Sequence, residues 1–163
     1  MRLYVFDADE TLRHTVVPDR PCPYAPGEWV LKPNVRERLA EIPFGPEGPY
    51  LGVASNQDRV GYGHLGEAMA RRLLEDMVVA ATGGLPDARV EMCPHTAEEG
   101  CDCRKPRPGM LLRLLDHFGV APHEAIFVGD TEADRRAAEA AGMHFAWAWD
   151  FFARPGQRAT TAR

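Results

Sequence analysis

The sequence has few features that would suit a membrane or a nucleic-acid partner. It has 19 lysines and arginines against 24 acidic residues, a net charge of −5, and only two of the basic residues are lysines. An acidic chain without a basic stripe is not typical of proteins that bind nucleic acid or anionic membranes. Its apolar beginning reaches Asp7 after a few residues and is too short for a secretory signal or a spanning helix. We therefore expect a cytoplasmic protein.

Cysteine is also scarce, with four residues, and the chain of 163 residues is long enough to bury a core without disulfides. We expect one domain over residues 1–153 and a flexible tail from Arg154 to Arg163, which is small, polar and basic. Nothing in the composition fixes an oligomeric state.

Short apolar runs alternate with segments of helical periodicity. The runs are Leu3 to Phe6, Tyr50 to Ala54, Arg89 to Met92 and Ala125 to Val128, and each ends abruptly in polar residues or cysteine. The helical segments are Leu65 to Val79, Met110 to Phe118 and Ala133 to Ala141. This alternation predicts an α/β fold, a three-layer sandwich whose parallel sheet has helices on both faces. Ligands in such folds bind beyond the carboxyl ends of the strands.

Two segments do not follow the alternation. Arg13 to Pro33 contains five prolines and little periodicity, and we interpret it as a long loop over the sheet edge. Near the C-terminus, Trp147, Trp149 and Phe151 alternate with other residues, which predicts a final strand at the edge of the sheet. No insertion is large enough to form a separate cap domain.

Asp7 and Asp9 follow the first predicted strand and lie two residues apart. In extended geometry both carboxylates point to one side, where they repel each other. A hard divalent cation such as Mg2+ would compensate that repulsion. The alternative is a turn with two solvated acids.

Polar residues also follow the later strands. Ser55 and Asn56 end the second run, where a hydroxyl and backbone N–H groups are able to hold phosphoryl oxygens, although a cap or turn explains them equally well. Arg104 and Lys105 precede a predicted helix and would offset the charge of a phosphoryl group; the alternative is a solvated basic loop. Asp130 follows the fourth run and is also a candidate helix cap.

A separate cluster has the spacing of a metal site. Cys93, His95, Cys101 and Cys103 offer three thiolates and an imidazole within eleven residues, which suits tetrahedral Zn2+. A disulfide is a poor alternative in a reducing compartment. The four ligands complete the coordination without water, so we expect a structural site that fixes the loop carrying Lys105. Cys22 has no partner in this scheme.

Taken in order, these motifs resemble the haloacid dehalogenase (HAD) superfamily of phosphatases. They are the Asp-x-Asp-x-Thr from Asp7 to Thr11, then Ser55, Lys105, and the Gly-Asp-x-x-x-Asp from Gly129 to Asp134. The resemblance implies a HAD-like Rossmannoid fold. Glu10 stands where glycine is common in the family, and we expect a stiffer loop with little effect on the chemistry.

The resemblance also implies roles. Asp7 would attack phosphorus to form an aspartyl-phosphate, and Asp9 would act as general acid and then as general base. Ser55, Asn56, Arg104 and Lys105 would bind the substrate phosphate. Mg2+ would be held by Asp7, the backbone carbonyl of Asp9, and Asp130. Thr11 and Asp134 would support this arrangement.

The zinc motif resembles a subfamily that includes D-glycero-D-manno-heptose-1,7-bisphosphate phosphatases and histidinol-phosphate phosphatases. The segment from Arg104 to Met110 is more similar to the heptose enzymes, whereas Ser55 to Asp58 and the His95 to Cys101 gap are more similar to the histidinol type. We therefore expect a Mg2+-dependent phosphatase of a small phosphorylated metabolite, a sugar phosphate ahead of histidinol phosphate. The alternatives are a polynucleotide 3′-phosphatase and a non-catalytic zinc module that binds phosphorylated ligands.

Overall fold

The computed structural model describes residues 1–154, and its centre is a five-stranded sheet. The strand order is β5-β4-β1-β6-β7, and every neighbouring pair is parallel. The strands are β1 (Leu3–Phe6), β4 (Tyr50–Asn56), β5 (Arg89–Cys93), β6 (Ala125–Gly129) and β7 (His144–Trp147). The first strand therefore lies in the middle, and the α/β prediction is confirmed.

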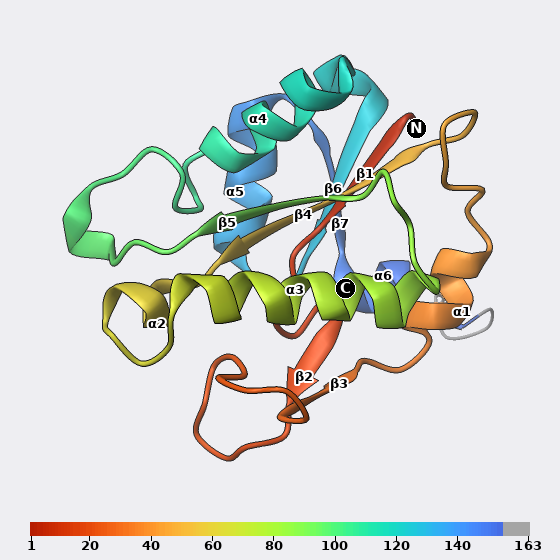
Figure 1. The fold of residues 1–163 in the computed structure, drawn as a ribbon. Helices are drawn as coiled ribbons and strands as arrows, with labels where there is room; N and C mark the ends of the chain where they lie inside the picture. Colours follow the sequence, from red (N-terminus) through yellow and green to blue (C-terminus); the bar gives the residue numbers. More distant parts are fainter. Residues whose placement is uncertain (155–163) are drawn as a thin grey trace.

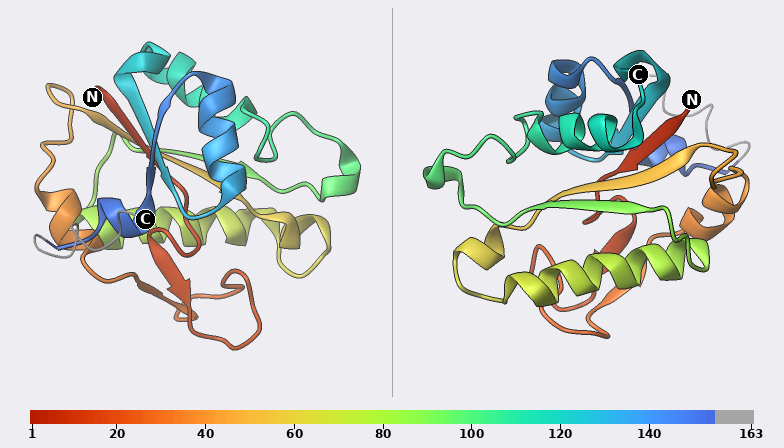
Figure 2. Two further views of the ribbon diagram at one scale, coloured as in Figure 1. Left: turned by 180° about the vertical axis from the view of Figure 1, so that it is seen from behind. Right: turned by 45° about the horizontal axis from the view of Figure 1, so that its top comes forward.

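Helices cover both faces of this sheet (Figure 1). The helices α4 (Gly109–Phe118) and α5 (Glu132–Ala141) lie on one face. The other face carries α1 (Val35–Ala40), α3 (Glu67–Thr82) and α6 (Ala148–Phe151), and the two further views separate the same layers (Figure 2). A short helix, α2 (Asp58–Gly61), follows β4, and two 3-10 turns lie at Ala97–Glu99 and Pro122–Glu124.

The apolar residues of β1 alternate between the two faces. Leu3 and Val5 pack with the buried leucines of α4, whereas Phe6 packs with Leu74 of α3 and Phe151 of α6. Because β1 is buried on both sides, its sequence is a continuous apolar run, as expected for the centre of a parallel sheet. This packing fixes the position of the residues that follow Phe6.

The prediction of a long loop from Arg13 to Pro33 holds for residues 16–28 but was wrong at both ends of the segment. This segment contains an antiparallel hairpin of β2 (Arg13–Thr15) and β3 (Trp29–Leu31), which lies below the main sheet in Figure 1. Each strand has only three residues, so neither gives a recognisable alternating pattern.

The predicted final strand at the sheet edge is present as β7, but it does not continue through Trp149 and Phe151. Trp147 ends β7, and the chain then turns into α6, so Phe151 and Phe152 contact Phe6 from a helix. Of the predicted tail, Arg154 donates a hydrogen bond to Asn34, and residues 155–163 lie outside the described part. In the part of the chain described, no helix is long and apolar enough to cross a membrane.

Candidate active site

Asp7 is the first residue after β1, and the sheet itself fixes its backbone. Its N–H donates to the carbonyl of Val128, at 2.9 Å, so Asp7 continues the pairing of β1 with β6. Its side chain is buried and accepts a hydrogen bond from Lys105 Nζ at 2.7 Å on one oxygen. The other oxygen lies 3.3 Å from the hydroxyl of Thr11. One carboxylate oxygen therefore faces an ammonium group.

Lys105 reaches Asp7 from a loop 98 residues further along the chain. Its Nζ also lies 2.7 Å from a carboxylate oxygen of Asp134 and 2.8 Å from the carbonyl oxygen of Ala54. Burial opposes the charge of this amine, but Asp7 and Asp134 outweigh it and raise the pKa of Lys105 above its usual value. Three acceptors for three ammonium protons hold the group in one place.

Asn56 fixes the backbone of Lys105. Its Oδ1 accepts from the Lys105 N–H at 3.0 Å, and its Nδ2 donates to the Lys105 carbonyl oxygen at 3.2 Å. Both polar groups of the Asn56 side chain are used in this way. Asn56, at the end of β4, therefore fixes the backbone of Lys105 and also lines the cavity at Asp7.

Asp130 follows β6 directly, and Asp134 lies in the first turn of α5. The Asp134 carboxylate accepts from the backbone N–H groups of Asp130 and Thr131, both at 3.1 Å, and so caps α5 while it also binds Lys105. Gly129 permits this approach, because a Cβ there would lie 2.5 Å from the Asp134 side chain.

Carboxylates outnumber cations at this edge of the sheet. Oxygens of Asp7, Asp130 and Asp134 lie within 4.8 Å of one another, with Lys105 as the ammonium among them. Burial raises the pKa of Asp7 well above its ordinary value, and Asp134 and Asp130 raise it further against the opposing effect of Lys105. Hard divalent cations prefer oxygen ligands of this kind, so the donor set fits Mg2+.

The Asp9 side chain is held apart from these three carboxylates. One oxygen accepts from Arg13 Nε at 2.8 Å, and the other accepts from Gln57 Nε2 at 2.8 Å. Gln57 also donates to the hydroxyl of Ser55 at 2.8 Å, and that hydroxyl is buried. Asp7 and Asp9 still line one cavity of about 320 Å³.

Arg104 does not line this cavity but forms an ion pair with Asp58, which does, at 3.3 Å. Cys22 lines it too, and burial raises the pKa of that thiol to about 12, so it is a protonated thiol at neutral pH. Glu10, in the turn, has a positive φ of 63° and contacts His14 and Lys32. The strain that this backbone conformation causes at a non-glycine residue is opposed by these contacts.

The four residues of the C-x-H-x5-C-x-C motif form one cluster. Cys103 Sγ lies 3.1 Å from Cys93 Sγ and 3.2 Å from His95 Nδ1, and Cys101 Sγ lies 3.6 Å from Cys93 Sγ. A tetrahedral zinc site places its sulfurs about 3.8 Å apart. The Arg104 N–H donates to Cys101 Sγ at 3.4 Å, which connects the cluster to Lys105. The donor set therefore fits Zn2+.

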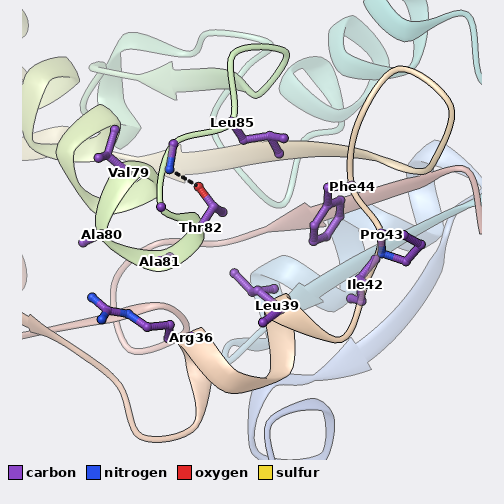
Figure 3. Close-up of a pocket in the computed structure, with 13 residues that line it drawn as sticks. Arg36, Leu39, Ile42, Pro43, Phe44, Val79, Ala80, Ala81, Thr82 and Leu85 are labelled. Carbon is purple, nitrogen blue, oxygen red and sulfur yellow. Dashed lines mark hydrogen bonds between the residues drawn. The ribbon is translucent and has the colours of Figure 1, made fainter.

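A second cavity, of about 520 Å³, lies away from these groups between α1 and the end of α3 (Figure 3). Its walls are mostly apolar, including Leu39, Phe44 and Leu85, and Arg36 is its one ionisable side chain. It has no group able to act as nucleophile or base in phosphate chemistry. The candidate active site is therefore the cavity at Asp7.

The structure thus brings one set of predicted site residues to a single edge of the sheet: Asp7, Asp9, Ser55, Lys105, Asp130 and Asp134. For Asp7, Ser55 and Asp130, the positions after predicted strands indicated this placement. Sequence reasoning missed the roles of Arg13 and Gln57. Their signal was weak. Arg13 lies four residues after Asp9, at the start of the segment interpreted as a loop, and Gln57 lies two residues after Ser55, in the polar residues that follow the second predicted strand.

Comparison with known proteins agrees with this geometry. Residues 102–148 match the model of the HAD-hydrolase-like family. The structure resembles the heptose 1,7-bisphosphate phosphatase of B. bronchiseptica, which was crystallised with magnesium and phosphate, with a TM-score of 0.73. The two are 29% identical, over 89% of this chain and 79% of that one. The fold is that of HAD-like hydrolases.

Two relatives in sequence carry related names. The D-glycero-beta-D-manno-heptose-1,7-bisphosphate 7-phosphatase of Pseudomonas aeruginosa is 39% identical over 69% of this chain and 63% of its own length. The corresponding alpha enzyme of Mycobacterium tuberculosis is 33% identical over 81% of this chain and 68% of its own length. This chain belongs to the HAD-like hydrolase family. The match with the first of these relatives spans less than two thirds of that relative's length.

Proposed function

We propose that this protein is a phosphomonoesterase that acts on a small phosphorylated sugar and uses Asp7 as its nucleophile. The observation that carries the proposal is the buried contact of 2.7 Å between Asp7 and Lys105, in a cavity that Asp9 also lines. An ammonium group at this position offsets the charge of an incoming phosphoryl group next to the attacking oxygen.

The chain's own residues account for two steps. In the first, an Asp7 oxygen attacks phosphorus while the bond to the leaving oxygen breaks and Asp9 gives that oxygen a proton. In the second, Asp9 takes a proton from water as the water attacks phosphorus, which releases inorganic phosphate and restores Asp7. Lys105 offsets the charge of the phosphoryl oxygens, and the hydroxyl and backbone N–H groups at Ser55 and Asn56 would bind them. Thr11 and Asp134 hold the nucleophile and the lysine in place.

Metal ions belong to the same proposal. Asp7, the backbone carbonyl of Asp9, and Asp130 would hold Mg2+, which when bound neutralises charge on the phosphoryl oxygens. Magnesium and phosphate in the crystals of the B. bronchiseptica enzyme support this assignment. Cys93, His95, Cys101 and Cys103 would hold a structural Zn2+ that fixes the loop leading to Lys105.

For the substrate we propose a heptose bisphosphate, because the named relatives act on heptose 1,7-bisphosphates at the 7-phosphate. Relatives with both anomeric names match, so the choice of anomer is left to experiment. A cytoplasmic location is part of the proposal, because free thiols, including the metal-site cysteines, are typical of a reducing compartment. We assign the activity to a single domain, residues 1–153.

The test is phosphate release, with Mg2+, from a heptose bisphosphate, histidinol phosphate and a 3′-phosphorylated oligonucleotide. We expect the heptose ester to be hydrolysed fastest. The variant Asp7→Asn should lose turnover by at least about a thousandfold while it keeps its fold and bound zinc, since the amide is a poor nucleophile. Turnover retained in this variant would refute the mechanism, and no hydrolysis of any substrate by the unaltered protein would refute the activity.

A further inference from the structure

Arg13 is the largest side chain that is fully buried in the described chain, at 1% exposure. Burying a guanidinium group is costly unless a carboxylate and hydrogen bonds compensate it. The residue stands at the start of β2, directly after the turn that carries Asp7 and Asp9. Its burial therefore needs a physical reason in that turn.

The partner is Asp9. Arg13 Nε donates to Asp9 Oδ1 at 2.8 Å, and Nη2 lies 3.5 Å from Oδ2. Gln57, the residue directly after β4, donates to Oδ2 at 2.8 Å. Each oxygen of the Asp9 carboxylate thus accepts a strong hydrogen bond from a buried side chain, and the group cannot rotate without losing at least one of them.

Backbone hydrogen bonds also hold Arg13 next to Asp9. The Glu10 N–H donates to the carbonyl oxygen of Arg13 at 2.8 Å, and the Arg13 N–H donates to that of Ala8 at 3.1 Å. These bonds close the turn and place Arg13 beside Asp9, to which it is also joined as an isolated bridge. Any movement of Asp9 therefore has to displace a buried arginine.

A purely stabilising ion pair is the competing explanation. Buried ion pairs add little net stability compared with apolar side chains of similar volume. Arg13 also has a buried nitrogen, Nη1, with no hydrogen-bond partner among the described residues, which costs further free energy. Because such a pair adds little net stability, we attribute it to its effect on the orientation of Asp9.

We propose that Arg13 is a positioning residue: with Gln57, it holds the Asp9 carboxyl group in the orientation from which it gives a proton to the leaving oxygen and later takes one from water. The inference rests on the proposed function above. Arg13 does not line the cavity at Asp7, so we expect it to act on proton transfer through Asp9 and not on phosphate binding.

Two consequences distinguish this role from a structural one. Protonation of the leaving oxygen matters most for a sugar ester, whose leaving alkoxide is strongly basic, and little for p-nitrophenyl phosphate, whose leaving phenolate is stable. Misplacing Asp9 should therefore lower kcat for the sugar ester much more than for the aryl ester. The Michaelis constants should change little, because ground-state binding is untouched.

The experiment compares Arg13→Met, Arg13→Lys and the surface control Arg135→Met on a heptose bisphosphate and on p-nitrophenyl phosphate, with Mg2+. For Arg13→Met we expect kcat to fall about 100-fold on the sugar ester and less than about 10-fold on the aryl ester. Arg13→Lys, which keeps the charge, should recover part of the sugar-ester rate. Arg135→Met should behave as the unaltered protein does.

A double-mutant cycle completes the test. If Arg13 works through Asp9, adding Arg13→Met to Asp9→Asn should change kcat less than about threefold. The inference would be overturned if Arg13→Met and Arg13→Lys lowered kcat equally on both esters. It would also be overturned if Arg13→Met caused a further large loss of kcat in the Asp9→Asn background. Either result would leave the proposed function unaffected. If Arg13→Met does not fold, the test uses Arg13→Lys alone, and the inference requires a larger loss of kcat on the sugar ester than on the aryl ester. Absence of turnover in the unaltered protein would remove both proposals together.

Discussion

Replacing Lys105 with methionine removes the one ammonium group in contact with two buried carboxylates. In the native protein its Nζ lies 2.7 Å from Asp7 and from Asp134, and all three side chains are less than 10% exposed on a whole-residue basis. Methionine has nearly the same length, so the change leaves little empty volume. What is lost is the charge and three hydrogen bonds.

The expected cost is large. Removing one partner of a buried ion pair costs about 3–5 kcal/mol, because the remaining charge is left without compensation. That is a large part of the roughly 5–15 kcal/mol by which a domain is stable. The free energy of unfolding of a small domain falls by about 2 kcal/mol per molar urea, so the urea concentration at the unfolding midpoint should fall by roughly 2 M.

The chain supplies its own control, because Lys32 is its other lysine. Its ion pair with Glu10 spans 3.2 Å between side chains that are 36% and 48% exposed, so Lys32→Met should cost less than about 1 kcal/mol. Urea unfolding of both variants in metal-free buffer measures the difference. Adding Asp7→Asn to Lys105→Met should recover part of the loss. Equal midpoints for the two lysine variants would refute the electrostatic account of the site.

Two further predictions concern metal content and pH. Elemental analysis should find about one zinc per chain in the unaltered protein and in Cys22→Ser but little in Cys101→Ser, and zinc retained by Cys101→Ser would exclude the four-residue site. Because burial raises the pKa of Asp7 above its ordinary value of 3.8, the metal-free folded state keeps a proton that the unfolded chain releases. The free energy of unfolding of the unaltered protein, relative to that of Asp7→Asn, should therefore fall as the pH rises from about 4 through the raised pKa. Urea titrations at several pH values measure this difference. A difference that does not change with pH would contradict a raised pKa at Asp7.

Much of the fold was predictable because its three central strands, β1, β4 and β6, are largely buried. The boundaries of β1 were predicted to the residue, since four apolar residues end at a charged one. The hairpin of β2 and β3 was not, because strands of three residues that include Arg13 and His14 have no alternating apolar pattern. The helix α6 was missed because a short aromatic run suits either period.

The residues of the candidate site also fall into two groups, those that the sequence indicated and those that it did not. Asp7 and Lys105 stood out because an acid after an apolar run and a rare lysine before a helix are visible without a structure. Arg13 and Gln57 did not, because a polar residue in a loop is usually solvated and only tertiary packing buries these two. Asn56 was assigned to phosphate, whereas both polar groups of its side chain bind the Lys105 backbone.

The distances along the chain between contacting residues also affect the order in which the candidate active site and the metal cluster form during folding. The contact between Asp7 and Lys105 joins residues 98 positions apart, and that between Thr11 and Asp130 joins residues 119 apart. The candidate active site therefore forms only once nearly the whole chain has collapsed. The cysteine and histidine cluster spans only residues 93–103. Closing a short segment costs less conformational entropy than closing a long one. During refolding, metal uptake at the cluster should therefore precede the recovery of turnover.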